Sequence, residues 1–155
     1  MNYKLAPASE FSEDEKELFK NFVADKGQVY MKSLNKLIDN SILLFIPDTI
    51  NIDAVGALKI PTKKHKEKVF GKSKSGLDPK DFKFELGWIV SLKERQGLGK
   101  KVVEFLLNCQ PKNYATVRED NDAMIHILEK YGFKKYGDPY KSERGDYKIV
   151  LYVKE

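Results

Sequence analysis

The sequence predicts a single α/β domain, with a mixed, twisted sheet of about six or seven strands and about four helices. Short apolar runs bounded by Pro, Gly and Asp alternate with segments whose apolar residues recur at helical spacing. The chain has 155 residues, 41% of them hydrophobic, which is enough for one packed core. No internal repeat, low-complexity segment or linker divides it, so we expect one domain over residues 1–155.

The first part of the chain predicts the order strand, helix, helix, strand, strand. Ser12 followed by Glu15 has the spacing of a capping box, which indicates a helix start, and Gly27 is an expected stop. Tyr30, Met31, Leu34, Leu37 and Ile38 form an apolar stripe, which is typical of core packing. The expected elements are residues 2–6, 12–27, 29–39, 41–46 and 54–60.

A lysine-rich segment then interrupts the strands. Residues 61–80 hold seven lysines against Glu67 and Asp78, an excess equal to the whole net charge of +5. Residues 61–81 are too long for a hairpin turn, and Val69 and Phe70 favour a short helix. We expect a basic insertion between strands, serving as a lid or as part of the acceptor side. Its lysines are either a solvated surface or a steering patch for an anionic partner.

The most informative stretch is residues 84–99. An apolar strand over 84–90 leads through a polar corner to Gly97-Leu98-Gly99, and an amphipathic helix follows to about Asn108. Glycines at such a turn let a backbone approach a ligand closely. The first amides of the helix lack partners and lie at the positive end of its dipole. This pattern favours a phosphate, although a tight turn with nothing bound would look the same.

The rest of the chain predicts a strand over 114–117 and a helix over 121–131, which Gly132 ends. Residues 134–140 and 146–153 are expected to pair as a final hairpin.

Three motifs in this second half resemble the GNAT N-acyltransferase superfamily: Glu-Leu-Gly-Trp at 85–88, Arg-Gln-Gly-Leu-Gly at 95–99, and Asn121 followed by Leu-Glu-Lys-Tyr-Gly-Phe at 128–133. The resemblance covers roughly residues 82–155. It implies a GNAT-like fold whose central strands splay to admit a coenzyme arm. It also implies an N-acetyltransferase that uses acetyl-CoA as co-substrate and no metal, with a primary amine attacking the thioester directly.

The resemblance implies where the coenzyme binds. The amides from Gln96 to Lys100 would bind the pyrophosphate, and the side chains of Arg95 and Lys100 would supply positive charge. The main chain of the central strand would bind the pantetheine arm, and Asn121 would contact that arm or serve as a plain helix N-cap. The implied residues are Ile89, Val90, Arg95, Gln96, Gly97, Leu98, Gly99, Lys100 and Asn121.

The resemblance also implies that Glu85 is the candidate general base, acting through water. Strand alternation puts Gly87 and Ile89 on its face, which leaves room for a substrate. The alternative is an outward-facing glutamate paired with a lysine.

Leu128 stands where relatives often have a tyrosine that protonates the leaving thiolate. Tyr131, Tyr136, Tyr140 or water could replace it, and we name Tyr131 as the catalytic candidate; the alternative for Tyr131 is helix-end packing. Arg118 and Tyr140 are candidate substrate contacts. Arg118 could instead pair with Glu119 or Asp120.

Two other functions remain open. The first is an acyltransferase whose acceptor is an amine on a nucleic acid, such as a tRNA or a modified base, bound through Lys63–Lys74. The second is a non-catalytic acyl-CoA-binding module, because Leu128 and Glu94 depart from the superfamily pattern.

Composition narrows the partners and the location. The single cysteine, Cys109, excludes an internal disulfide, and two distant histidines give no sign of a metal site. No apolar run is long enough to span a bilayer, so we expect a cytoplasmic protein without a membrane partner. The expected substrate is a small-molecule or peptide amine, and a homodimer would be usual for the superfamily.

Overall fold

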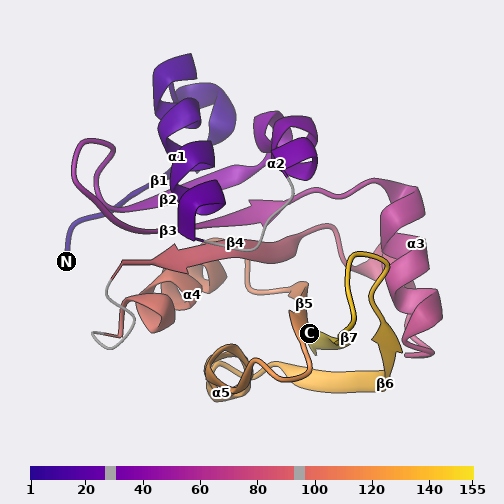
Figure 1. Ribbon diagram of the computed structural model, residues 1–155. Coiled ribbons are helices and arrows are strands. Elements are labelled where there is room, and N and C mark those ends of the chain that lie inside the picture. The colour runs from indigo at the N-terminus through magenta and orange to yellow at the C-terminus, as the bar shows by residue number, and fades with distance from the viewer. Residues whose placement is uncertain (27–30, 93–96) are drawn as a thin grey trace. The chain divides into compact units, whose positions relative to one another are not determined.

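The computed structural model describes residues 1–26, 31–92 and 97–155. Its seven strands hydrogen-bond in the order β1-β2-β3-β4-β5-β7-β6, a mixed sheet (Figure 1). The chain packs as two compact units, residues 1–60 with 86–109 and residues 61–85 with 110–155. Strand β4 (Glu85–Ser91) gives its first residue to the second unit and the others to the first.

The described part of the first unit holds four strands and three α-helices. Strands β1, β2 and β3 pair antiparallel, and two short 3₁₀ turns, Ala8–Glu10 and Ile38–Asn40, join the elements. Beside β4, its elements are β1 (Lys4–Pro7), α1 (Glu13–Lys26), α2 (Met31–Leu37), β2 (Ile42–Pro47), β3 (Ile52–Lys59) and α4 (Leu98–Cys109).

The capping box predicted at the start of α1 is confirmed. The Ser12 amide donates to Glu15 Oε1 at 2.9 Å, and the Glu15 amide donates to Ser12 Oγ at 3.1 Å. Two amides that an unprotected helix end would leave without partners are therefore satisfied. The expected stop at Gly27 lies outside the described residues.

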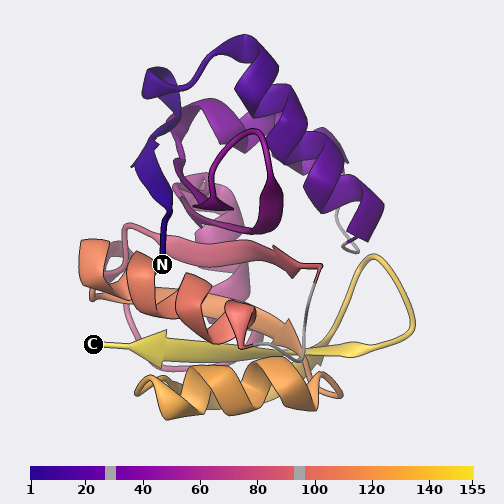
Figure 2. The same cartoon turned by 90° about the vertical axis from the view of Figure 1, so that its left-hand side faces the viewer.

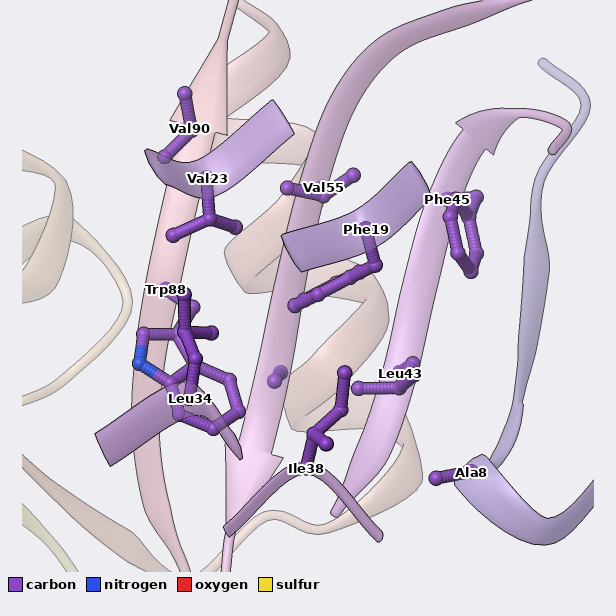
Figure 3. Packing of buried hydrophobic residues seen from close by; sticks show 11 residues of the cluster. Ala8, Phe19, Val23, Leu34, Ile38, Leu43, Phe45, Val55, Trp88 and Val90 are labelled. Atoms are coloured by element: carbon purple, nitrogen blue, oxygen red, sulfur yellow. The ribbon is translucent and has the colours of Figure 1, made fainter. Parts of the chain in front are cut away.

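Apolar side chains from α1, α2 and the strands make the core of the first unit (Figure 3). Phe19 packs edge-on against Phe45 of β2, at a centroid distance of 5.6 Å, and against Trp88 of β4, at 6.1 Å. Leu34 of α2 is fully buried beside them. Leu34, Leu37 and Ile38 of the predicted stripe pack in this core, whereas Met31 is exposed and Tyr30 lies outside the described residues.

The second unit contains three strands in the order β5-β7-β6, and both pairings among these three are antiparallel. Helix α5 lies alongside β7 (Figure 2) and buries Leu128. The predicted hairpin is confirmed as β6 with β7. The elements are α3 (Lys63–Lys72), the 3₁₀ turn Pro79–Asp81, β5 (Asn113–Arg118), α5 (Asp122–Lys130), β6 (Lys134–Lys141) and β7 (Lys148–Lys154).

The basic insertion is largely structured. The Thr62 side chain caps α3 by accepting from the His65 amide at 3.2 Å, and Val69 and Phe70 are buried with Phe82 and Tyr114 in the core of this unit. The short helix that Val69 and Phe70 predicted is thus present. It brings the number of α-helices in the described part of the chain to five rather than the expected four.

Several lysines of the insertion have local partners. Lys66 Nζ donates to the Phe82 carbonyl at 2.8 Å. Lys68 and Lys72 both contact the Glu143 carboxylate, Lys72 at 2.8 Å. Those two lysines lower the pKa of Glu143 to about 2. The interpretation of the segment as wholly solvated is therefore too simple, because part of its charge joins α3 to the loop between β6 and β7.

The predicted α/β fold is confirmed in its element order and sheet. The splay expected between the central strands concerns the placement of the two units and stays a prediction. Among the described helices, none has both the length and the apolar character needed to cross a membrane.

Candidate active site

Polar side chains gather on one face of the strands of the second unit. Glu85 lies opposite Tyr114 in parallel register, and alternation puts Thr116 on the same face as Tyr114. Thr116 pairs with Leu151, Arg118 and Tyr140 both pair with Ile149, and cross-strand partners share a face. The register therefore brings three residues predicted from the sequence, Glu85, Arg118 and Tyr140, together with Tyr114 and Thr116.

Glu85 is a buried carboxylate. Its exposed fraction is 3%, and the Thr116 hydroxyl donates to Glu85 Oε2 at 3.3 Å. Burial excludes the alternative in which this side chain faces outward from the sheet. A carboxylate is costly to bury without partners, so its place inside the unit fits a chemical role better than a surface one.

Two tyrosine hydroxyls lie within reach of the charge on Glu85. Burial raises the pKa of Tyr140, and the negative charge of Glu85 raises it further. The pKa of Tyr114 is raised by the same two causes, burial first, with a further contribution from Tyr140. Both side chains therefore stay protonated and able to donate a hydrogen bond at any pH near neutral.

Tyr114 is a member of this cluster that the sequence analysis missed as a functional residue. It is fully buried, and its hydroxyl has no hydrogen-bond partner among the described residues. The sequence shows only an apolar strand at this position. The signal that finds it is the register of β4 against β5, which no local pattern encodes.

Arg118 does not take the ion pair that was considered for it. Its guanidinium stacks on the Tyr147 ring, with Cζ 3.8 Å from the ring centroid. In the described part of the chain, no ion pair between Arg118 and Glu119 or Asp120 is found. Stacking leaves the edge of the guanidinium able to donate to a carboxylate or phosphate.

The remaining candidates on α5 have structural partners. Asn121 is the N-cap, and its Oδ1 accepts from the Met124 amide at 3.1 Å. Tyr131 is the C-cap residue, half-buried, with Lys130 Nζ 5.8 Å from its ring centroid. Leu128 is 1% exposed and belongs to the core, so no proton donor stands at that position.

The first turn of α4, in the first unit, has the features expected of a phosphate site. Gly97 has φ +73°, and the space in which a β-carbon would lie is open. The Lys101 amide donates to the Gly97 carbonyl at 3.2 Å, so the helix begins there. The amides of Leu98, Gly99 and Lys100 precede that first bond and lack intrahelical acceptors. They fit the pyrophosphate of a coenzyme.

The other coenzyme candidates are divided between described and undescribed parts of the chain. Ile89 is half-buried and Val90 is buried, both on β4. Trp88, just before them, has φ +51°, a backbone conformation that is uncommon for a residue other than glycine. Arg95 and Gln96, like Glu94, lie outside the described residues. Over the described ranges, no group of three or more metal-ligating side chains is found.

No family model and no curated protein sequence matches this chain. Solved structures match it closely in fold. An acyl-CoA N-acyltransferase from Pseudomonas aeruginosa is 16% identical, with 99% of both chains covered and a TM-score of 0.69. The ribosomal-protein-S18-alanine N-acetyltransferase from Escherichia coli is 14% identical over 97% of this chain and 92% of its own, with a TM-score of 0.64.

A third structure, NAA60 from Arabidopsis thaliana in complex with acetyl-CoA, is 11% identical, with 98% of this chain and 97% of that chain covered and a TM-score of 0.66. The order of elements, the mixed seven-stranded sheet and these matches lead to one conclusion: the chain has the fold of the GNAT N-acetyltransferase superfamily.

Proposed function

We propose that this protein is an acetyl-CoA-dependent N-acetyltransferase that acts on a primary amine by direct attack. The observation that carries the proposal is the buried Glu85 carboxylate, held by Thr116 and accompanied by the protonated hydroxyl of Tyr140. A carboxylate that can accept a proton and a tyrosine hydroxyl that can donate one suit a reaction that removes one proton and supplies another.

The residues have separate roles in this proposal. Acetyl-CoA supplies a thioester carbonyl as the electrophile. An alkylammonium ion is not a nucleophile, so the acceptor must lose a proton, which Glu85 accepts through water. Tyr140 donates a hydrogen bond to the acceptor or to the departing group. Tyr131, the candidate named from the sequence, is the second place to look for the acid.

The amides of Leu98, Gly99 and Lys100 would bind the pyrophosphate, with Arg95 and Gln96 preceding them. The main chain at Ile89 and Val90 would bind the pantetheine arm, and Asn121 would contact it from the start of α5. Arg118 is proposed to bind an acidic group of the acceptor, because its stacked guanidinium keeps donors available.

The test is acetyl transfer measured by thiol release over a panel of amines. The panel includes a peptide with N-terminal alanine and an aminoglycoside, because similar structures carry those names, together with a polyamine and free amino acids. Glu85→Gln should lower kcat about 100-fold or more while acetyl-CoA binding is kept. Glu129→Gln, an exposed carboxyl on α5, is the matched control and should leave turnover unchanged.

Absence of turnover on every amine, with acetyl-CoA bound, would overturn the catalytic proposal in favour of an acyl-CoA-binding module. Comparison of Tyr140→Phe with Tyr131→Phe identifies the acid. The variant that loses kcat without a change in KM for acetyl-CoA removes a group used in the transition state.

A nucleic-acid-borne amine is a second candidate acceptor, favoured by one observation. The second unit holds seventeen basic and twelve acidic residues, whereas the first unit has eleven of each. The whole net charge of +5 therefore lies in the unit that contains Glu85 and α3. Activity on such a substrate should fall steeply with salt, and Lys64→Gln with Lys74→Gln should reduce that slope. No retention of RNA or DNA at low salt would remove this candidate.

A further inference from the structure

The Tyr114 hydroxyl is a buried polar group without a partner. The side chain is fully buried, and no hydrogen bond to its oxygen is found in the described part of the chain. Most buried hydroxyls in native proteins are hydrogen-bonded, because an unpaired one loses its hydration without compensation. A phenylalanine would fill the same space without that cost, so the hydroxyl needs an explanation.

The ring of Tyr114 is held in place from two directions. Its amide donates to the Phe84 carbonyl at 3.2 Å, which fixes the backbone next to the start of β4. Phe70 of α3 packs edge-on against the ring, with a centroid distance of 5.1 Å and an interplanar angle of 79°. The hydroxyl therefore has little freedom to find a partner elsewhere in the core.

Glu85 is a charged group that acts on this hydroxyl. Glu85 and Tyr114 are register partners, and the Glu85 charge acts on the Tyr114 hydroxyl. The Thr116 hydroxyl on β5 donates to this carboxylate, and the charge of Glu85 acts on the hydroxyls of Tyr114 on β5 and Tyr140 on β6. Phe70 of α3 packs against the Tyr114 ring. Each of the three hydroxyls is able to donate to a carboxylate.

We propose that Tyr114 is a positioning residue for Glu85. Its hydroxyl donates a hydrogen bond to the carboxylate in the working site, directly after a small shift or through one buried water, and α3 keeps the ring there through Phe70. The insertion thereby acquires a role that its lysines do not reveal, since its apolar face supports the candidate base. The catalytic part of this inference rests on the proposed function, whereas the hydrogen bond itself does not.

The hydrogen bond can be tested without turnover. Tyrosines labelled with ¹³C at Cζ are observed by NMR in the wild type and in Glu85→Gln. We expect the Tyr114 signal to move when the carboxylate becomes an amide, and the Tyr152 signal to stay, because Tyr152 is on the alternate face of β7 and is influenced by Glu129. An unmoved Tyr114 signal would overturn the proposal, whatever the enzyme acylates.

The kinetic consequence is tested with Tyr114→Phe on the best amine of the panel. We expect a fall in kcat of about 10-fold, an unchanged KM for acetyl-CoA, and an acid limb of the pH–rate profile at higher pH than in the wild type. A purely structural residue would leave the profile unmoved. Tyr152→Phe is the control and should retain the wild-type rate and profile.

The outcomes separate the two proposals. A wild type that acylates no amine defeats the proposed function, and the NMR comparison still decides the hydrogen bond. An active wild type with a Tyr114→Phe variant of unchanged rate and profile defeats the positioning role alone. Tyr114→Phe keeps the buried ring and its packing against Phe70, so we expect it to fold near neutral pH although it removes the proposed donor to Glu85. If it does not fold, the NMR comparison of the wild type with Glu85→Gln decides whether the hydrogen bond exists.

Discussion

Glu85 shows how a single position connects the chain's fold to its chemistry. The strand that carries it is apolar enough to be buried, and the residue enters the core with a donor from Thr116 at 3.3 Å. Tyr114 and Tyr140 add hydroxyls whose pKa is raised by burial and by the charge on Glu85. One carboxylate and its neighbours thus form a candidate site that combines a proton acceptor with hydroxyl donors.

The raised pKa of Tyr114 predicts a loss of stability at high pH. Below pH 10, the ordinary pKa of a tyrosine, the hydroxyl is protonated in both the folded and the unfolded state. Its contribution to the free energy of unfolding is therefore fully present there. Above that pH the unfolded chain ionises while the folded protein does not, so the free energy of unfolding falls. The slope approaches about 1.4 kcal/mol per pH unit for each such tyrosine.

Urea unfolding near neutral pH and at pH ~10.5 measures this effect, because the free energy of unfolding already falls with pH at the higher value. Tyr114→Phe should lose less stability than the wild type over that range. Tyr3→Phe, at an exposed position, should lose as much as the wild type. Equal losses in wild type and Tyr114→Phe would show that Tyr114 ionises freely in the folded state.

At the scale of elements, local sequence signals determine where α1 begins and where α5 ends, but they do not determine how α3 packs. The capping box starts α1, and the φ of +92° at Gly132 ends α5, both as the sequence predicts. Helix α3 could be expected only as a short helix, because Val69 and Phe70 are its sole apolar pair among lysines. Its contact with Tyr114 depends on residues far away in sequence, which no local pattern specifies.

The glycine that starts α4 is expected to matter for its conformation. Gly97→Ala places a β-carbon in open space but forces a left-handed residue with φ +73°, at a cost of about 1–2 kcal/mol. Gly71→Ala in α3 also meets nothing within 4 Å, and its φ is helical, so it should stabilise by about 0.5–1 kcal/mol. Thermal unfolding of both variants measures the difference, and a stable Gly97→Ala would contradict the assigned turn.

The aromatic contact from α3 is expected to support the second unit. Phe70→Ala removes a buried ring that touches Phe82 and Tyr114, and should destabilise by about 3–5 kcal/mol. Lys64→Ala, on the exposed side of the same helix, should change stability by less than about 0.5 kcal/mol. Similar small effects for both variants would mean that α3 is a surface appendage, and the insertion would again be a candidate lid.

At the scale of the whole molecule, the order of elements was predictable and the make-up of the site was predictable only in part. Hydrophobic periodicity, helix-capping residues and terminating glycines or prolines located nearly every strand and helix. The motifs indicated the superfamily whose structures match at 9–16% identity. Glu85 followed from that resemblance. Tyr114 did not, because its role depends on the register between β4 and β5. The positive φ at Trp88 is likewise set by tertiary context, since its residue type gives no hint of it.

The prediction that this protein binds a coenzyme rests on the turn before α4 and on the fold. Arg95 and Gln96 lie outside the described residues, so Gly97 and the amides of Leu98, Gly99 and Lys100 are the structural part of that expectation. The superfamily fold is compatible with many acceptors, and the acceptor must be found from chemistry.

The most direct test of the account is thermal unfolding with and without acetyl-CoA, with desulfo-CoA as the non-reactive control. Binding to the folded state at about 100 times Kd stabilises by about 2.7 kcal/mol, or a rise in Tm of about 5–10 °C for a chain of this size. We predict that rise for both ligands in the wild type and a smaller one in Gly97→Ala. No shift at millimolar acetyl-CoA would contradict the account, because the turn before α4 would then bind no donor.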